Sequence, residues 1–173
     1  MVVPPAASVC PKHVIIGVGD MAVSDDTDAV LSTYALGSCI GLVAYDPLAK
    51  VGGILHLMLP DSGIAPDKAA SQPAMFADTG LPQFFHLLAS YRSRPAHLQL
   101  FVAGGANVIL GYDPFRIGER NMRVTVDYLA LNGFVLKQAQ IGGTVNRTVH
   151  LELATGLVTV KASSREEKIS LAG

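Results

Sequence analysis

The sequence predicts an α+β fold, a single compact domain in which mixed, mostly antiparallel β-sheets carry two main helices packed outside them. Three observations lead to this prediction. Short apolar segments typical of strands outnumber helical patterns by about eight to two. An early antiparallel hairpin argues against a doubly wound parallel sheet, in which strands alternate with helices. The length, 173 residues, is that of one domain with a substantial core.

Taken in order, the predicted elements are mainly strands. We expect strands at 14–18, 29–34, 40–45, 51–59, 98–102, 134–141, 145–153 and 157–160. Apolar residues at helical spacing in 73–91, interrupted by Pro82, predict a short turn and then a helix. A second helix is expected at 117–132, because Asn132-Gly133 is a C-terminal stop signal. The Pro-, Gly-, Ser- and Asp-rich segment 61–72 predicts a loop, either the lid or wall of a cleft or a plain connector.

The ends of the chain are expected to lie outside the domain. We divide the chain into a flexible Pro- and Ala-rich leader at 1–12, a domain at 13–161 and a polar tail at 162–173, frayed or helical only with a partner. The N-terminus lacks the basic and apolar regions of a signal peptide, and no run reaches the ~18 apolar residues of a membrane span. We therefore expect a cytoplasmic protein, not embedded in a membrane, in which Cys10 and Cys39 are free thiols.

Charge and ligand spacing exclude two classes of function. The net charge is −1 and no basic stripe is present, so a nucleic-acid partner is not expected. The ligand-type residues show no metal-binding spacing, and four histidines are scattered singly: His13, His86, His97 and His150. The sequence therefore predicts no metal and no organic cofactor.

The early hairpin brings a thiol close to an imidazole. Two apolar runs flank the segment 46–50, in which Asp followed by Pro is a turn signal. A two-residue turn places Cys39 opposite His56, and a four-residue turn at Pro47–Lys50 places Gly41 opposite His56. Opposed Cβ atoms lie roughly 4.5–5.5 Å apart. Both registers predict a Cys–His neighbourhood.

Such a neighbourhood suits nucleophilic catalysis. A free thiol, with a pKa near ~8.5, is mostly protonated at neutral pH, and a neighbouring imidazole can accept its proton. Gly37 and Ser38 suit a bend that exposes the sulfur of Cys39 and leaves backbone N–H groups free for an oxyanion. The alternative is structural, since Cys often packs as a small hydrophobe and His56 lies in an apolar run. The residues alone leave both interpretations open.

The same residues resemble a known family. Leu36-Gly37-Ser38-Cys39, with Thr33 six positions before the cysteine and His56 within the segment 52–60, resembles the CheD family of chemoreceptor glutamine deamidases. Further matching positions are Gly104-Gly105-Ala106, Ile117-Gly118-Glu119-Arg120-Asn121, and Gly142-Gly143 with Arg147. The resemblance covers about 14–161 and implies a compact α+β domain with mixed sheets and outer helices.

The resemblance also implies a function. It implies a cysteine-dependent protein-glutamine glutaminase that converts glutamines of methyl-accepting chemotaxis receptors to glutamates through a thioester. Cys39 would be the nucleophile, His56 the general base and acid, Thr33 the residue that orients His56, and Gly104-Gly105 part of the cleft. The implied partners are the cytoplasmic helices of the receptor and a CheC-type phosphatase. Without the resemblance, Thr33 is an ordinary strand residue and Gly104-Gly105 a bulge or turn.

Three other functions compete with this one. A thiol transglutaminase or protease would use the same thioester, but would favour an Asn or Asp as the residue that orients His56. A non-catalytic adaptor for receptors or a phosphatase would not require Thr33, Cys39 and His56 together. An α/β-hydrolase elbow fits Gly37–Gly41, yet the chain lacks the parallel strand series of that fold and places its histidine too soon after the nucleophile.

Overall fold

The computed structural model describes residues 10–109 and 111–173, and in these residues ten strands form two stacked sheets of five strands each. The first sheet has the order β1-β3-β8-β9-β10, and the second has the order β2-β5-β4-β6-β7. Neighbours pair antiparallel except for β1 with β3 and β6 with β7. The predicted α+β class with mixed sheets is confirmed.

The strands of the first sheet are β1 (Lys12–Ile16), β3 (Ala29–Leu36), β8 (Arg147–Glu152), β9 (Leu157–Ala162) and β10 (Arg165–Ser170). Those of the second are β2 (Asp20–Ser24), β4 (Ile40–Asp46), β5 (Val51–Leu57), β6 (Gln99–Gly104) and β7 (Leu136–Ile141). The α-helices are α1 (Pro66–Ser71), α2 (Ala77–Ser90) and α3 (Ile117–Leu131). Short 3₁₀ turns lie at Ser62–Ile64, Pro73–Met75 and Pro95–His97.

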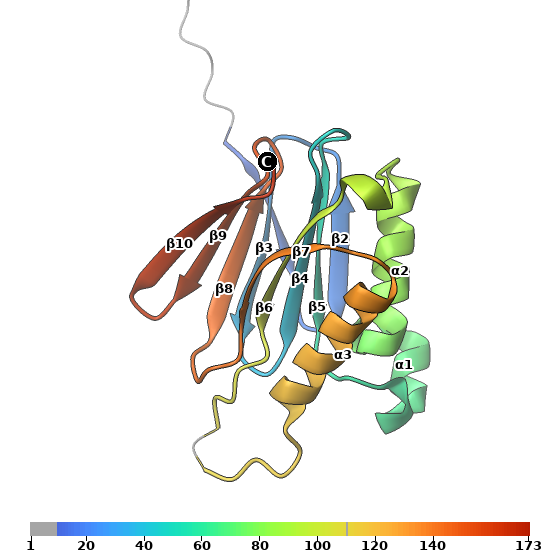
Figure 1. The fold of residues 1–173 in the computed structure, drawn as a ribbon, viewed down its shortest axis with the longest axis vertical. Coiled ribbons are helices and arrows are strands. Elements are labelled where there is room, and N and C mark those ends of the chain that lie inside the picture. The colour runs from blue at the N-terminus through green and yellow to red at the C-terminus, as the bar shows by residue number, and fades with distance from the viewer. Residues whose placement is uncertain (1–9, 110) are drawn as a thin grey trace, which may run out of the picture.

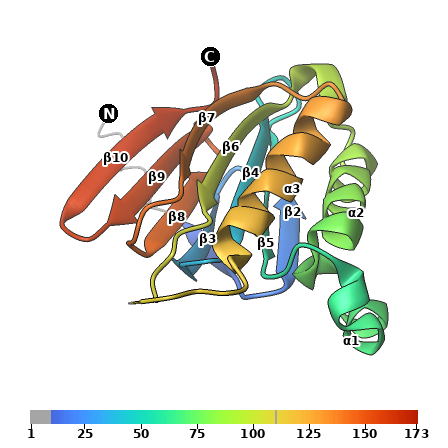
Figure 2. The same cartoon turned by 60° about the horizontal axis from the view of Figure 1, so that its bottom comes forward.

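The molecule has three layers, with α2 and α3 covering the outer face of the second sheet (Figures 1 and 2). One core lies between the sheets, where Val43 and Ile54 meet Leu31 and Val149. The other core lies between the second sheet and the helices. Every residue of β4 and β5 is buried because both faces of these central strands are covered. The two strands that flank the predicted site are therefore the most enclosed part of the fold.

The helices confirm the two predicted helical segments. Helix α2 begins at Ala77, just after the short turn at Pro73–Met75, and runs through Pro82. Two hydrogen bonds link the first turn of α2 to the residues before it. The Gly80 N–H donates to the Phe76 carbonyl at 2.7 Å, and Thr79 Oγ1 donates to the Pro73 carbonyl at 2.7 Å. The predicted loop at 61–72 contains a 3₁₀ turn and the short helix α1.

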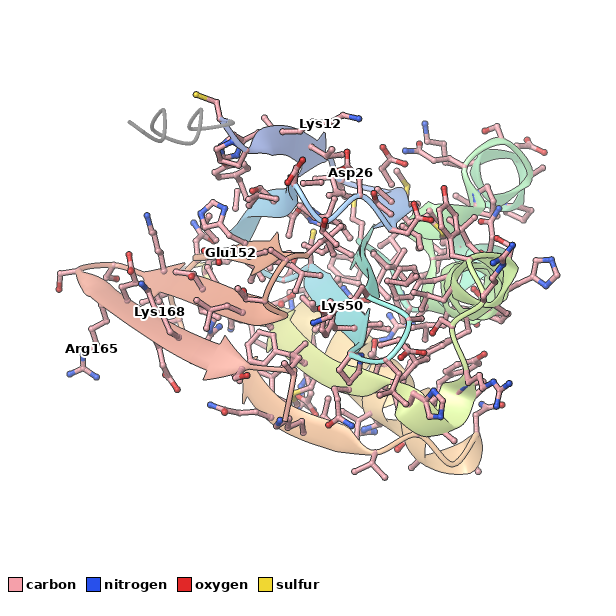
Figure 3. The ribbon with its side chains drawn as sticks, turned by 90° about the horizontal axis from the view of Figure 1, so that it is seen from above. Lys12, Asp26, Lys50, Glu152, Arg165 and Lys168 are labelled. Carbon is pink, nitrogen blue, oxygen red and sulfur yellow. The ribbon has the colours of Figure 1, made fainter. Side chains whose placement is uncertain are left out.

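The prediction of a frayed or partner-dependent helical tail is wrong. Residues 165–170 form β10, which pairs antiparallel with β9 at the edge of the first sheet. Ile169 and Leu171 are buried in the core between the sheets, whereas Arg165 and Lys168 are exposed, and Arg165 points away from the rest of the molecule (Figure 3). Charged side chains are typical of edge strands, where they oppose pairing with another chain.

Other expectations for the chain fall partly outside the described residues. Most of the predicted leader, residues 1–9, lies outside them, and β1 begins at Lys12. Both Cys10 and Cys39 are free thiols, as predicted. None of the helices among the described residues could span a membrane.

Candidate active site

The register of the hairpin is the one set by a four-residue turn. β4 pairs with β5 so that Asp46 lies opposite Val51 and Gly41 opposite His56. The two-residue turn, which would have placed Cys39 opposite His56, is wrong. Asp46 explains the longer turn, because its Oδ1 accepts hydrogen bonds from the N–H groups of both Leu48 and Ala49 at 3.0 Å.

Cys39 and His56 face the same side of the second sheet. Cys39 directly precedes β4, two positions before Gly41, and side chains two apart on a strand share a face. The sulfur packs against the core between the sheets, and the ring of His56 is directed into that same layer. The predicted Cys–His neighbourhood is thus consistent with the register and the burial.

His56 is held by a residue of the opposite sheet. Thr33 Oγ1, on β3, lies 2.7 Å from His56 Nδ1, on β5. The same hydroxyl donates its one hydrogen to the Ile16 carbonyl at 2.9 Å. Oγ1 must then accept from Nδ1–H, which fixes the neutral tautomer with a lone pair on Nε2. Among the described residues, this buried Nε2 has no hydrogen-bond partner.

Gly41 provides the space for this contact. A Cβ at Gly41 would lie 2.8 Å from a methyl group of Leu36 and 3.6 Å from the methyl group of Thr33. Since Gly41 lies directly opposite His56, its missing side chain lets residues of β3 approach the ring. A glycine at this strand position is explained by the close approach of the two sheets.

The electrostatics favour a neutral pair at rest. Burial lowers the pKa of His56 to about 4, so the imidazole is unprotonated at neutral pH. Burial raises the pKa of the half-buried Cys39 thiol, and a hydrogen bond from its own backbone N–H opposes that effect only in part. Both groups are therefore neutral at rest, and no thiolate is preformed.

The predicted cleft glycines contact the backbone of Cys39. The Gly105 N–H donates to the Cys39 carbonyl at 2.8 Å, and the Ala106 N–H donates to the Gly37 carbonyl at 2.8 Å. Gly104 has a φ of 111°, and a Cβ there would lie 2.0 Å from the Cys39 carbonyl oxygen. Gly105 also lines a cavity of about 320 Å³ together with Gly118, Gly142 and Gly143. The structure thus brings Gly104-Gly105 to the nucleophile candidate through the backbone.

The bend before Cys39 is also present. Gly37, Ser38 and Cys39 form a bend between β3 and β4. In the described part of the chain, the N–H groups of Ser38 and Cys39 donate to no backbone carbonyl. These two groups are the candidate donors for an oxyanion.

Two residues that lie near the site were not predicted to belong to it. Asn121, noted only as part of a matching segment, is fully buried on α3 and donates to the carbonyls of Ser38 and Met58. Asn146 packs close to Gly37, because a Cβ added at Gly37 would lie 2.8 Å from Asn146 Oδ1. Neither contact leaves a local signal in the sequence, because each joins segments far apart in the chain.

Other titratable side chains have partners of their own. Glu119, which lines the same cavity as Gly105, forms ion pairs with Arg116, directly before α3, and with Arg123 on α3. His97 lies 3.6 Å from Asp46, and His150 Nδ1 lies 2.7 Å from the hydroxyl of Ser32. Among the described residues, no group of three or more metal-ligating side chains is found.

Comparisons with known proteins agree on one family. The family model described as CheD chemotactic sensory transduction matches residues 58–162. The chain is 43% identical over 150 residues to a "Probable chemoreceptor glutamine deamidase CheD 1" of Syntrophus aciditrophicus, covering 87% of this chain and 94% of that protein. It is 39% identical over 158 residues to a "Probable chemoreceptor glutamine deamidase CheD" of Solibacter usitatus, covering 91% and 94%.

The likeness to solved structures is more distant. The hypothetical protein YfiH of Bacillus licheniformis is 12% identical, with a TM-score of 0.47, over 72% of this chain and 50% of that one. A TM-score of this size assigns neither a fold family nor a function to the chain.

Proposed function

Because the chain belongs to the CheD family, we propose that it is a protein-glutamine deamidase that converts glutamine side chains of chemoreceptors to glutamates through a thioester on Cys39. One observation carries the proposal. The hydrogen bond from His56 Nδ1–H to Thr33 leaves Nε2 as a free base on the face of the sheet that also carries Cys39. Relatives named as probable chemoreceptor glutamine deamidases give the substrate class.

In the first half of the reaction, His56 Nε2 removes the proton of the Cys39 thiol as the sulfur attacks the carboxamide carbon of the substrate. The N–H groups of Ser38 and Cys39 hold the developing oxyanion. When the tetrahedral intermediate collapses, the C–N bond breaks and the imidazolium donates its proton to the leaving nitrogen. Ammonia departs and a thioester remains on Cys39.

In the second half, His56 Nε2 removes a proton from a water molecule that attacks the thioester carbon. The C–S bond then breaks, and the proton returns to the sulfur of Cys39. The net reaction converts glutamine and water to glutamate and ammonia, with the enzyme regenerated. Each step uses side chains and backbone of this chain, and His56 alternates between base and acid.

Thr33 supports both roles of His56. When Nε2 gains a proton, the positive charge spreads over the ring to Nδ1–H, which donates to Thr33 Oγ1. The Thr33 hydroxyl donates in turn to the Ile16 carbonyl. The chain of two hydrogen bonds stabilises the imidazolium that burial disfavours. Because the thiol and the imidazole are both neutral at rest, a proton must pass from Cys39 to His56 before or during nucleophilic attack.

The competing functions receive less support. A transglutaminase or thiol protease of the kind considered above has an Asn or Asp at Nδ1, a position that Thr33 occupies here. An adaptor that only binds receptors or a phosphatase gives no reason for a buried histidine with an unpaired Nε2. The receptor helices and a CheC-type phosphatase remain the partners that we propose.

The direct test is the intact mass of a chemoreceptor cytoplasmic fragment before and after incubation with the protein. We expect the small gain in mass that accompanies replacement of –NH₂ by –OH, with peptide mapping locating it at glutamines. The Cys39→Ala variant should produce no gain. A gain with both proteins would refute the role of Cys39, and binding of the fragment without any gain would favour the adaptor.

A further inference from the structure

We infer that Asn121 is a positioning residue for the deamidation reaction, holding together the two backbone segments that carry Cys39 and His56. The inference rests on the proposed function for the identity of the reaction. It concerns a residue on α3, outside the sheet that carries Cys39 and His56.

The carboxamide of Asn121 bridges the ends of β4 and β5. Nδ2 donates one hydrogen to the Ser38 carbonyl at 2.9 Å and the other to the Met58 carbonyl at 2.8 Å. Ser38 directly precedes Cys39, and Met58 follows His56 by two positions. Within a carboxamide only the –NH₂ group donates, so the two carbonyl partners also fix the orientation of the Asn121 side chain.

The bridge continues the β4–β5 ladder where the backbone pairing ends. The last paired residues at this end are Ile40 and Leu57. Beyond them the two segments diverge, because the N–H of Met58 donates to the Met75 carbonyl and the carbonyl of Cys39 accepts from Gly105. Among the described residues, Asn121 is the side chain that hydrogen-bonds both diverging segments.

The close packing of Gly118 on the backbone of Gly105 and Ala106 fixes the position of α3 next to the site. A Cβ at Gly118 would lie 2.7 Å from the Ala106 carbonyl oxygen and 2.8 Å from that of Gly105. The first turn of α3 therefore rests on the backbone that braces Cys39. Asn121 follows three positions later on the same helix, which brings its side chain within reach of the Ser38 and Met58 carbonyls.

The chemistry of Asn121 is better explained by positioning than by stability. The side chain is fully buried, yet its Oδ1 has no partner in the described residues. An unpaired buried acceptor is costly for folding, and this cost offsets part of the stability that the two donated hydrogen bonds contribute. What the asparagine supplies in return is a fixed separation between the segments that hold the thiol and the base. A displacement of about 1 Å at a reacting pair can lower a rate by roughly 10²-fold.

The test compares Asn121→Ala with Thr125→Val in a Cys10→Ser background, in which Cys39 is the one remaining thiol. Thr125 is the matched control, because it is also buried on α3, one turn further along, with an Oγ1 that has no partner in the described structure. Asn121→Ser, which keeps one donor, is the second variant in case Asn121→Ala does not fold. For each protein the melting temperature, the kcat and KM for a receptor fragment, and the pH profile of Cys39 alkylation by iodoacetamide are measured.

We expect kcat to fall by about 10²-fold in Asn121→Ala, with a smaller change in KM and a shifted alkylation profile. Asn121→Ser should lose less, and Thr125→Val should match its parent in kcat and profile. A change in melting temperature alone, with kcat and alkylation profile retained in the Asn121 variants, would overturn the inference. If the parent does not deamidate but Asn121→Ala shifts the alkylation profile, the proposed substrate is wrong while the positioning role stands. If the parent deamidates and neither Asn121 variant differs from it, the positioning role alone is wrong.

Discussion

Thr33 and His56 belong to different sheets, and the 2.7 Å hydrogen bond between Thr33 Oγ1 and His56 Nδ1 crosses the core of the molecule. The orientation of the imidazole therefore depends on how the two sheets stack. Thr33 is in turn fixed by the Ile16 carbonyl of the neighbouring strand β1. This relationship makes the hydroxyl of Thr33, and not its methyl group, the feature on which the proposed chemistry depends.

Thr33→Val should therefore reduce kcat for deamidation by at least about tenfold. The substitution keeps the shape but leaves buried Nδ1–H unpaired, at a cost of roughly 1–3 kcal/mol, and about 1.4 kcal/mol corresponds to a tenfold change in rate. Thr33→Ser should restore most of the activity. Ser32→Ala is the control, since the buried Ser32 is on the same strand but bonds His150 instead. Equal rates for Thr33→Val and the wild type would remove Thr33 from the mechanism.

The low pKa of His56 predicts activity well below neutral pH. An imidazole with a pKa of about 4, compared with 6.5 for the free side chain, remains an effective base across mildly acidic conditions. The acidic limb of the kcat/KM profile should therefore lie clearly below 6.5. A limb at or above 6.5 would show that His56 is not the desolvated base described here. The measurement is the initial deamidation rate at subsaturating substrate over a pH series.

The same pKa predicts a loss of stability in acid. The folded-state pKa of His56 lies below the unfolded value, so at falling pH the unfolded chain takes up the proton first. The free energy of unfolding should then decrease from about pH 6.5 down to about pH 4, by up to roughly 3 kcal/mol. Urea denaturation at several pH values measures it. The decrease should be smaller in His56→Gln, and an identical decrease in both proteins would assign the effect to other groups, such as His150, whose pKa is also lowered by burial.

How far the site could be predicted depends on the range of the contacts. The apolar runs of β4 and β5 and the turn between them are local, so the hairpin and the position of Cys39 near His56 were predicted in both registers. The register is set by the hydrogen bonds that the Asp46 side chain accepts in the turn. The sequence Asp46-Pro47 indicates a turn but does not indicate its length. The contact of Thr33 with His56 was expected from family resemblance alone, since it joins two sheets.

The parts that were missed share a physical cause. The segment Arg165-Glu166-Glu167-Lys168 has no apolar alternation, so β10 could not be distinguished from a solvated tail. Its pairing follows from β9, which supplies a complete antiparallel register. Asn121 looks like any polar residue on an amphipathic helix, and its burial becomes evident when α3 lies on the Gly105–Ala106 backbone. Tertiary packing decides both cases.

Gly104→Ala should destabilise the protein more than Gly142→Ala and should also abolish most of the activity. Both glycines have a positive φ, 111° and 76°, so both substitutions impose backbone strain of roughly 1–2 kcal/mol. Gly142 has no atom within 4 Å of an added Cβ, whereas the Cβ at Gly104 would lie 2.0 Å from the Cys39 carbonyl oxygen. Relief of that overlap requires movement of the segment that carries the sulfur. Thermal melts and the alkylation rate of Cys39 measure the two effects, and equal behaviour of the two variants would contradict the close packing of Gly104 on Cys39.

Asp46→Ala tests how much the capped turn stabilises the hairpin. Burial raises the pKa of this carboxyl, but hydrogen bonds from the N–H groups of Ala49, Arg94 and Leu48 outweigh that effect and hold its pKa below the usual 3.8. Loss of a buried acceptor for three N–H groups should lower the free energy of unfolding by at least about 1–3 kcal/mol. Asp61→Ala is the control, because Asp61 accepts from a single exposed N–H, that of Gly63. Asp46 lies at the end of β4 far from Cys39, and His56 pairs with Gly41 near the other end. Therefore kcat should change little in the Asp46→Ala molecules that remain folded. A large fall in kcat with unchanged stability would show that the turn acts on the site directly.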